Sequence, residues 1–257
     1  MADVEYGSMS GLDVPKRSSS HWNVNDEDSH EKLHGIAPAN VHNNFVRKVY
    51  GLLAVELLYT SAICALIMFV SPIRNAVVNF ATNNPMVFEI LLLVCLVGSI
   101  CWLMCVQRQY PLNMYALTVF VTFMSIDVGI VCAVYYEIGY GNLILLSVLI
   151  TAAIFVGLST YAWLSTSDFS YLGGFLFAAL CGLLILGIVQ IFVHIKWLYI
   201  VYCALGVLVF SGYIIFDTWK IKTKIGPDDS VLASIMLYLD LVNLFLMILQ
   251  LLAASKR

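Results

Sequence analysis

Apolar residues run in seven long stretches, and short polar connections separate them. Each stretch is close to the ~20 residues that an α-helix needs to cross ~30 Å of hydrocarbon. All six prolines lie outside the stretches, and proline costs a helix interior about 3 kcal/mol, which supports the boundaries. The pattern predicts an all-α membrane protein with seven transmembrane helices: Tyr50–Val70, Met86–Val106, Leu112–Val134, Leu143–Leu164, Tyr171–Val193, Trp197–Trp219 and Val231–Ala253.

The N-terminal stretch has a different character. Residues 1–48 are rich in acids, Ser, Asn and His, and they show almost no apolar periodicity. Such a composition is typical of a disordered tail, and it lacks the apolar core of a secretory signal. We therefore expect a disordered cytosolic tail over 1–48 and a seven-helix domain over 49–254, whose first span is an uncleaved signal anchor.

Composition and charge agree with a membrane protein. The chain of 257 residues is 61% hydrophobic and 11% charged, with a mean hydropathy of +0.90, outside the range of soluble globular domains. The net charge of -3 provides no basic surface, so we expect no nucleic-acid partner. The seven cysteines lie in apolar stretches, and nothing in their spacing indicates a disulfide framework or a zinc site.

Basic residues near the span ends predict the orientation. Positive charge accumulates on the cytosolic side of membrane proteins. With the N-terminus cytosolic, that side holds Arg47, Lys48, Arg108, Lys220, Lys222 and Lys224, and the opposite side holds Arg74 and Lys196. Lys256 and Arg257 would then break the rule after seven full crossings. We expect the seventh segment either to span the membrane inside the bundle or to be re-entrant.

Asp217 and Asp240 are the candidates for the functional site. Each is the lone acid of its apolar stretch, and a carboxylate in hydrocarbon costs roughly 2.5–3.5 kcal/mol on insertion scales. The sequence indicates no Lys or Arg at comparable depth to neutralise them. If adjacent helices bring the two together, they cannot both ionise cheaply, and one proton would be shared. This arrangement suits a proton-gated cation site.

Asp240 belongs to a polar stripe on the seventh segment. Met236, Asp240, Asn243, Met247 and Gln250 follow a 4-3-4-3 spacing, which places them on one helix face. We expect this face to look into the bundle. Asn243 adds a neutral oxygen to a cation pathway, or else Asn243 and Gln250 only form hydrogen bonds between helices.

Three further acids extend the candidate pathway. Glu56 lies about two turns into the first span and either joins the Asp pair or extends its head group to the membrane surface. Glu89 lies near the start of the second span, where an interfacial acid is the simpler alternative. Asp127 lies deeper in the third span. Together Glu89 and Asp127 would form a luminal mouth that attracts cations.

Several motifs resemble a known family. The chain reads FVRKVYGLL at the first span, YPLNMYALTVF at the third, DFSYLGGFLFAAL at the fifth, and FDTWKI followed by YLDLVNLFLMILQLL at the end. Over roughly residues 40–254 it resembles the transmembrane Bax inhibitor motif family, in particular its lifeguard and Golgi anti-apoptotic protein branch. The resemblance implies seven helices with the last one central, a pH-sensitive calcium leak from intracellular stores, and suppression of cell death.

The resemblance also implies roles for individual residues. Asp217 and Asp240 match the family's di-aspartyl pH sensor, and as metal ligands they would hold calcium only transiently. Glu89 matches an acid of the second helix in bacterial relatives. Some of those relatives carry an intramembrane Arg that binds the aspartates as a basic latch. Here the second span holds no base before Arg108, so Arg108 or Arg47 is the candidate latch.

We therefore expect a calcium leak channel of intracellular membranes, in the Golgi, the endoplasmic reticulum or the lysosome. Calcium and protons would be its partners, with the lipid bilayer and apoptosis-regulating membrane proteins; we expect a monomer without a cofactor. The alternative is a non-conducting protein that regulates cell death through partner helices.

We expect no enzymatic activity. An intramembrane aspartyl protease would need a GxGD motif around one Asp, and a zinc hydrolase would need a His cluster within the spans. The sequence has neither feature; the one His outside the tail, His194, lies at a span end.

Overall fold

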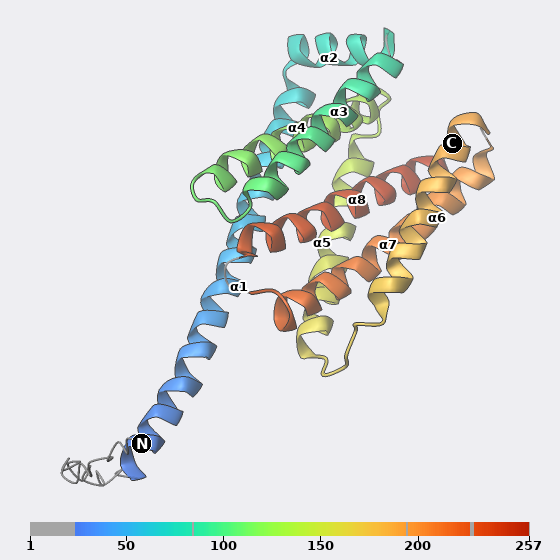
Figure 1. Ribbon diagram of the computed structural model, residues 1–257. Helices are drawn as coiled ribbons and strands as arrows, with labels where there is room; N and C mark the ends of the chain where they lie inside the picture. The colour runs from blue at the N-terminus through green and yellow to red at the C-terminus, as the bar shows by residue number, and fades with distance from the viewer. Residues whose placement is uncertain (1–23, 84, 194, 227–228, 257) are drawn as a thin grey trace, which may run out of the picture. The chain divides into compact units, whose positions relative to one another are not determined.

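A computed structural model describes residues 24–256 except 84, 194, 227 and 228. Within these residues the chain forms eight α-helices and no strand (Figure 1). The helices are α1 (Val24–Phe69), α2 (Ser71–Asn83), α3 (Pro85–Val106), α4 (Leu112–Glu137), α5 (Gly141–Leu164), α6 (Leu172–Phe192), α7 (Lys196–Thr223) and α8 (Ser230–Lys256). The predicted all-α class is confirmed.

Every predicted span lies in a helix of its own. Six helical segments of the described chain are long and apolar enough to cross a membrane, in α1 from Val41 onward and in α4, α5, α6, α7 and α8. In α3 the described apolar stretch is shorter, at Ile90–Val106. Six of the seven predicted spans thus meet the length for a membrane crossing within the described residues, and the second predicted span, Met86–Val106, forms a helix (α3) whose described apolar part is shorter.

Helix α2 was not predicted. Its residues lie between two predicted spans, in a segment that is too short and too polar to span a membrane. Pro72 lies in the first turn of α2, where a missing N–H breaks no helical hydrogen bond. Val78 is buried against Ile67 of α1 and Ala133 of α4, so tertiary packing stabilises this short helix.

The chain divides at Asn40 into two units, Met1–Asn40 and Val41–Arg257. In the first unit the described part is the opening stretch of α1, from Val24. Helix thus occupies part of the segment 1–48 that was expected to be disordered, and residues 1–23 lie outside the described residues. Extending an existing helix avoids the costly nucleation step, so the helix can begin several turns before its apolar part.

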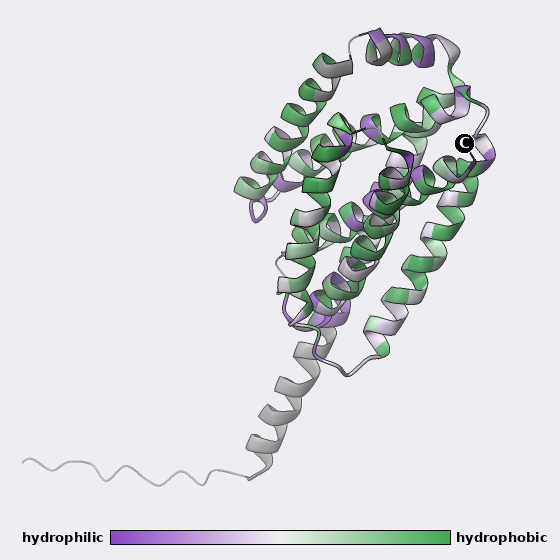
Figure 2. Ribbon diagram, turned by 90° about the vertical axis from the view of Figure 1, so that its right-hand side faces the viewer, coloured by the Kyte–Doolittle hydropathy of each residue, from purple (hydrophilic) through white to green (hydrophobic). Residues whose placement is uncertain are grey.

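Helix α8 is the most buried of the six candidate spans. It packs against α4, α5 and α7, and Leu237, Tyr238, Leu244 and Leu249 are fully buried along it. The helix runs without a break for 27 residues, so it contains no turn of the kind that a re-entrant segment needs. Figure 2 shows that the helices of this unit are mostly hydrophobic along their length.

Candidate functional site

Asp217 of α7 and Asp240 of α8 face each other inside the helix bundle. Their side chains lie near enough to interact with each other. Both residues are buried, at 5% and 6% exposure. Among the described residues, Oδ2 of Asp240 has no hydrogen-bond partner. The structure therefore brings the two predicted acids together and leaves one of their oxygens without a partner.

Lys220 supplies a positive charge beside this pair. Its Nζ lies 3.6 Å from Oδ1 of Asp217, although no base was expected at that depth from the sequence. The expectation was wrong because residues three positions apart share a helix face, and a long Lys side chain reaches back along it. The same Nζ lies 4.0 Å from Sδ of Met236 and 5.3 Å from the centre of the Phe216 ring.

The polar stripe of α8 faces α7 along most of its length. Near its far end, Oε1 of Gln250 accepts a hydrogen bond of 3.2 Å from the Tyr199 hydroxyl and one of 3.8 Å from the Cys203 thiol. Between this contact and the Asp pair, α7 and α8 approach closely at Gly206, where an added Cβ would lie 2.6 Å from Sδ of Met247. Gln250 thus joins two helices, as the simpler alternative expected.

Asn243 is the member of the stripe that bonds within its own helix. Its Nδ2 donates a hydrogen bond of 2.8 Å to the carbonyl oxygen of Leu239, and the residue is half-buried. This bond uses one N–H of the amide and leaves its oxygen for other contacts. A role of Asn243 in a cation pathway stays a prediction.

Glu56 is a second buried acid, on the other side of α8. It is 4% exposed, so its head group does not extend to the surface. Its Oε1 accepts a hydrogen bond of 2.9 Å from the Ser234 hydroxyl of α8, while its Oε2 has no hydrogen-bond partner among the described residues. Ser234 and Asp240 lie six residues apart, about 600° around the helix, and therefore point to different neighbours.

A chain of hydroxyl groups lies one turn further along the same interface. Oγ1 of Thr60 lies 2.9 Å from the Tyr238 hydroxyl, and the Ser125 hydroxyl of α4 donates to Thr60 at 3.0 Å. Glu56 and Thr60 are four residues apart, as are Ser234 and Tyr238, so α1 and α8 run parallel here. This set was not predicted from the sequence, although the matching i, i+4 pairs of polar residues in two apolar helices were a usable signal.

Of the two acids predicted to form a luminal mouth, the structure describes the side chain of Asp127 but not that of Glu89. The side chain of Glu89 lies outside the described residues, so its proposed role is a prediction without structural detail. Asp127 is half-buried within α4. A luminal mouth formed by these acids stays a prediction.

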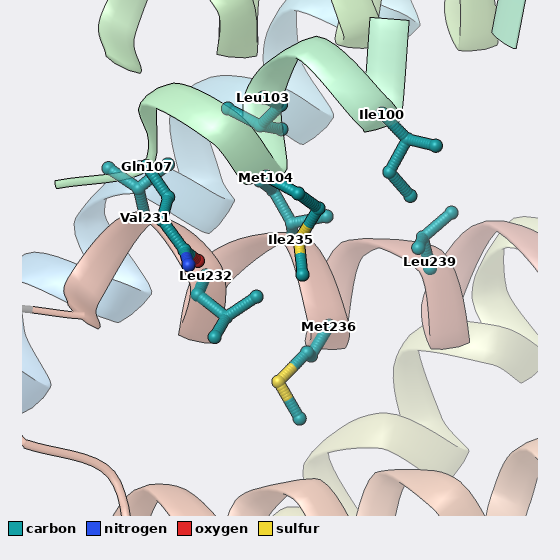
Figure 3. Close-up of a pocket in the computed structure, with 9 residues that line it drawn as sticks. All are labelled: Ile100, Leu103, Met104, Gln107, Val231, Leu232, Ile235, Met236 and Leu239. Carbon is teal, nitrogen blue, oxygen red and sulfur yellow. The ribbon is translucent and has the colours of Figure 1, made fainter. Parts of the chain in front are cut away.

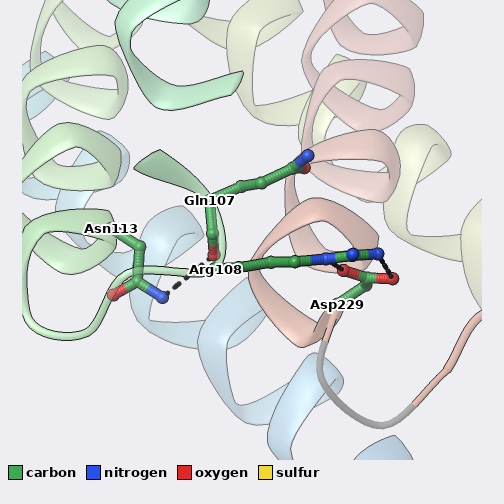
Figure 4. A network of polar contacts seen from close by, with 4 residues as sticks. All are labelled: Gln107, Arg108, Asn113 and Asp229. Atoms are coloured by element: carbon green, nitrogen blue, oxygen red, sulfur yellow. Dashed lines mark hydrogen bonds and ion pairs between the residues drawn. The ribbon is translucent and has the colours of Figure 1, made fainter. Parts of the chain in front are cut away.

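The candidate latch residues lie in other surroundings. Arg108, after the end of α3, forms a two-bond ion pair with Asp229, before α8, at 2.9 and 3.0 Å (Figure 4). The hydrogen bonds from this guanidinium hold the pKa of the Asp229 carboxyl below its usual range. Arg47 is exposed on α1. A latch by either arginine stays a prediction; the base that contacts the Asp pair in this structure is Lys220.

A small cavity of about 110 Å³ lies between α3 and α8 (Figure 3). Its wall is apolar apart from Gln107, and it includes Leu103 of α3 and Val231 and Ile235 of α8. Met236 also lines the cavity and contacts Lys220 on its other side. Met236 therefore contacts both this cavity and the lysine that pairs with Asp217.

The described residues contain no group of three or more His, Cys, Asp or Glu that could hold a metal ion. Calcium takes six to eight oxygen ligands when it is tightly bound. The carboxylates of Asp217 and Asp240, beside the ammonium group of Lys220, supply fewer oxygen ligands than such a site has. A transient calcium contact at Asp217 and Asp240 stays a prediction.

Comparison with known proteins assigns a family to this arrangement. The family model described as inhibitor of apoptosis-promoting Bax1 matches residues 42–257. A Golgi anti-apoptotic protein of vaccinia virus (strain Lister) is 37% identical over 90% of this chain and 94% of its own. Protein LIFEGUARD 1 of Arabidopsis thaliana is 35% identical over 80% of this chain and 86% of its own. Protein lifeguard 4 of Mus musculus is 34% identical over 86% of this chain and 90% of its own.

Proposed function

Since the chain belongs to the Bax inhibitor family, we propose that it suppresses cell death from within an intracellular membrane by leaking stored calcium under the control of pH. The names of its relatives, which include Golgi and anti-apoptotic proteins, support the Golgi as its location and apoptosis as the process. The six long apolar helices of the described chain support a multi-pass arrangement. We place the N-terminus in the cytosol, as the basic residues indicate.

The observation that supports the leak best is the burial of Asp217 and Asp240 against each other. Two carboxylates inside an apolar bundle are expensive to maintain, and intramembrane acids commonly mark ion or proton pathways. Two acids beside a single base, Lys220 among the described residues, attract cations and repel anions. Glu56, buried on the other side of α8, adds to the negative charge of the interior.

Gating follows from the pair itself. When one proton bridges the two carboxyls, it holds α7 and α8 together at this depth. Loss of that proton adds repulsion between two buried charges, which favours separation of the helices. A change of a few kcal/mol at one contact is enough to shift a two-state population substantially. The proton would therefore act as the closing element and calcium as the permeant ion.

The second candidate is a non-conducting interaction protein. Gln250, Tyr199 and Cys203 join α7 to α8 without any charge, so this interface has a purely structural part. In this view the proton-bridged Asp pair only fastens two helices, and partner membrane proteins carry the effect on cell death. This protein would tolerate replacement of both acids by neutral residues of the same shape.

Calcium flux in liposomes separates the two candidates. The purified full chain is reconstituted as wild type, Asp217→Asn and Asp240→Asn, and calcium flux is measured between pH 6 and 8. The leak predicts flux in the wild type that varies with pH, and a pH dependence that is lost or shifted in each variant. Asp168→Asn is the matched control, because Asp168 is exposed in the connection after α5 and accepts a hydrogen bond from the Ser170 N–H.

Absence of wild-type flux across this pH range would rule out the leak. The same holds if Asp217→Asn leaves both the flux and its pH dependence unchanged. In either case the interaction protein is the better description, and its test is survival of cells that express the double variant Asp217→Asn, Asp240→Asn.

A further inference from the structure

Lys220 occupies the place beside Asp217 that a permeant cation would need. Its Nζ lies 3.6 Å from Oδ1 of Asp217, within the range of an ion pair. Met236 and the ring of Phe216 border the same ammonium group, at 4.0 Å and 5.3 Å. The positive charge next to Asp217 therefore belongs to a side chain of the protein itself, Lys220.

We propose that Lys220 is a tethered competitor of calcium, whose ammonium group must leave Asp217 before calcium can bind the two carboxylates. Lys220 thereby keeps calcium binding at this pair weak, which is what a leak requires. This inference rests on the proposed function and adds the residue that sets the affinity of its site.

A count of charges indicates that calcium replaces the Lys220 ammonium group at the Asp pair and does not bind beside it. With both carboxylates ionised, Asp217 and Asp240 carry two negative charges, which one calcium ion balances. If Lys220 stayed in place, the same site would hold three positive charges against two negative ones. An unbalanced charge in a buried site costs several kcal/mol, whereas an exchange of cations leaves the site neutral. Calcium and the ammonium group should therefore exclude each other.

The position of Lys220 allows it to leave. It lies in the last turn of α7, and its side chain is 31% exposed while that of Asp217 is 8% exposed. A Lys side chain has a flexible four-carbon stem and a strongly hydrated head group. The ammonium group can therefore move away from the carboxylate toward the end of α7. Asp217 cannot follow it, because it is held inside the bundle.

The neighbouring lysines have other contacts. Nζ of Lys222 donates hydrogen bonds to the carbonyl oxygens of Trp163 and Ser165, at 2.7 and 2.9 Å. Nζ of Lys224 lies 5.7 Å from the centre of the Trp219 ring, and Lys224 is exposed. Lys224→Met therefore removes the same charge from the same end of α7 without touching the Asp pair, and it is a matched control for Lys220→Met.

Calcium binding to the purified full chain tests the proposal. Calcium is titrated at one fixed pH into wild type, Lys220→Met, Lys220→Arg and Lys224→Met, and binding is followed by calorimetry. Lys220→Met should lower the Kd for calcium about tenfold, equivalent to ~1.4 kcal/mol. Lys220→Arg and Lys224→Met should stay close to the wild type. A variant that is merely less stable would lose affinity and not gain it.

Chemical rescue makes the test more specific. Lys220→Ala removes the stem and leaves room for a small ammonium ion at Asp217. Added ethylammonium should raise the apparent Kd for calcium in Lys220→Ala in proportion to its concentration, and it should have little effect on the wild type. Liposome flux should show the same order, with half-saturation of Lys220→Met at lower calcium concentrations.

Two results would overturn the proposal. One is an unchanged Kd for calcium in Lys220→Met, and the other is a failure of all variants to bind calcium. Failure of the leak itself is distinguishable from both. If the variants bind calcium in the expected order while the wild type passes no calcium in liposomes, Lys220 competes with calcium at a site that does not conduct.

Discussion

Tyr238 and Asp240 lie two residues apart on α8 and contact helices on different sides of it. The Tyr238 hydroxyl lies 2.9 Å from Oγ1 of Thr60 in α1, while Asp240 faces Asp217 in α7. Helix α8 is therefore held by polar contacts in two directions. A rotation of α8 about its own axis would break both sets, so a separation at the Asp pair is more easily made by movement of α7.

The close approach at Gly206 should be sensitive to side-chain size. An added Cβ would lie 2.6 Å from Sδ and 2.8 Å from Cγ of Met247, and Met is flexible enough to move aside in part. Gly206→Ala should cost about 1–3 kcal/mol, the usual range for overpacking, and Gly206→Leu should cost more. Thermal unfolding of the purified protein in detergent measures this.

Met247→Ala provides the control for that prediction. It creates space in front of residue 206, so the double variant Gly206→Ala, Met247→Ala should be more stable than the sum of the two single changes implies. Strict additivity would show that the two side chains do not compete for the same space.

Replacing Glu56 by Gln should stabilise the fold at pH 8. The amide oxygen of Gln can accept the Ser234 hydrogen bond, as Oε1 of Glu56 does, and Gln carries no charge into the bundle. A buried polar group without its hydrogen bonds costs about 1–3 kcal/mol, and a charged one costs more. Glu137→Gln, at an exposed ion pair with Arg74, should change the unfolding temperature little. A lower unfolding temperature for Glu56→Gln would contradict this explanation.

The Arg108–Asp229 ion pair should contribute to stability only above the range where Asp229 is protonated. Its pKa is lowered in the folded protein, so the contribution is complete above the ordinary Asp pKa of about 3.9 and disappears as the pH falls through the lowered value. Because Arg108 is 70% exposed, we expect ~0.2–1 kcal/mol. A double-mutant cycle with Arg108→Gln and Asp229→Asn should give this coupling at pH 7 and a smaller one as the pH falls towards 2. Equal coupling at both values would mean that charge is not its source.

Lys222→Met should destabilise the end of α5 without affecting calcium binding. Lys222 satisfies the carbonyl oxygens of Trp163 and Ser165, and a hydrogen bond from a charged donor contributes about 1.5–3 kcal/mol. Hydrogen exchange in the last turn of α5 should therefore become faster. The Kd for calcium should equal that of the wild type, in contrast to Lys220→Met.

Most of the fold could be predicted from the sequence, since hydropathy and proline positions directly mark long apolar helices. The stripe on α8 was also predictable, because its 4-3-4-3 spacing is a property of one helix alone. Asp217 and Asp240 were recognisable as a pair only because acids in such helices are so costly. The sequence pattern does not predict which helix packs against each face of α8.

The features that were missed depend on tertiary contacts or on side-chain length. Lys220 lies near the end of an apolar stretch, and only the path of its stem shows that it reaches Asp217. Helix α2 is too short to be recognised as a membrane span from its hydropathy, and the burial of Val78 against α1 and α4 stabilises it. The bond between Ser234 and Glu56 joins residues 178 positions apart, a separation at which single-sequence patterns carry no information about contact.

Because Asp217 and Lys220 belong to the same helix, their ion pair is available as soon as α7 has been synthesised. Asp240 follows later in the chain, so α7 meets the membrane before its partner carboxyl exists. An isolated carboxylate would then make insertion of α7 unfavourable by ~2.5 kcal/mol or more. A base one turn away lowers this penalty during biogenesis. Insertion of a nascent chain that ends after α7 should accordingly be less efficient with Lys220→Met than with the native lysine, whatever the finished protein does with calcium.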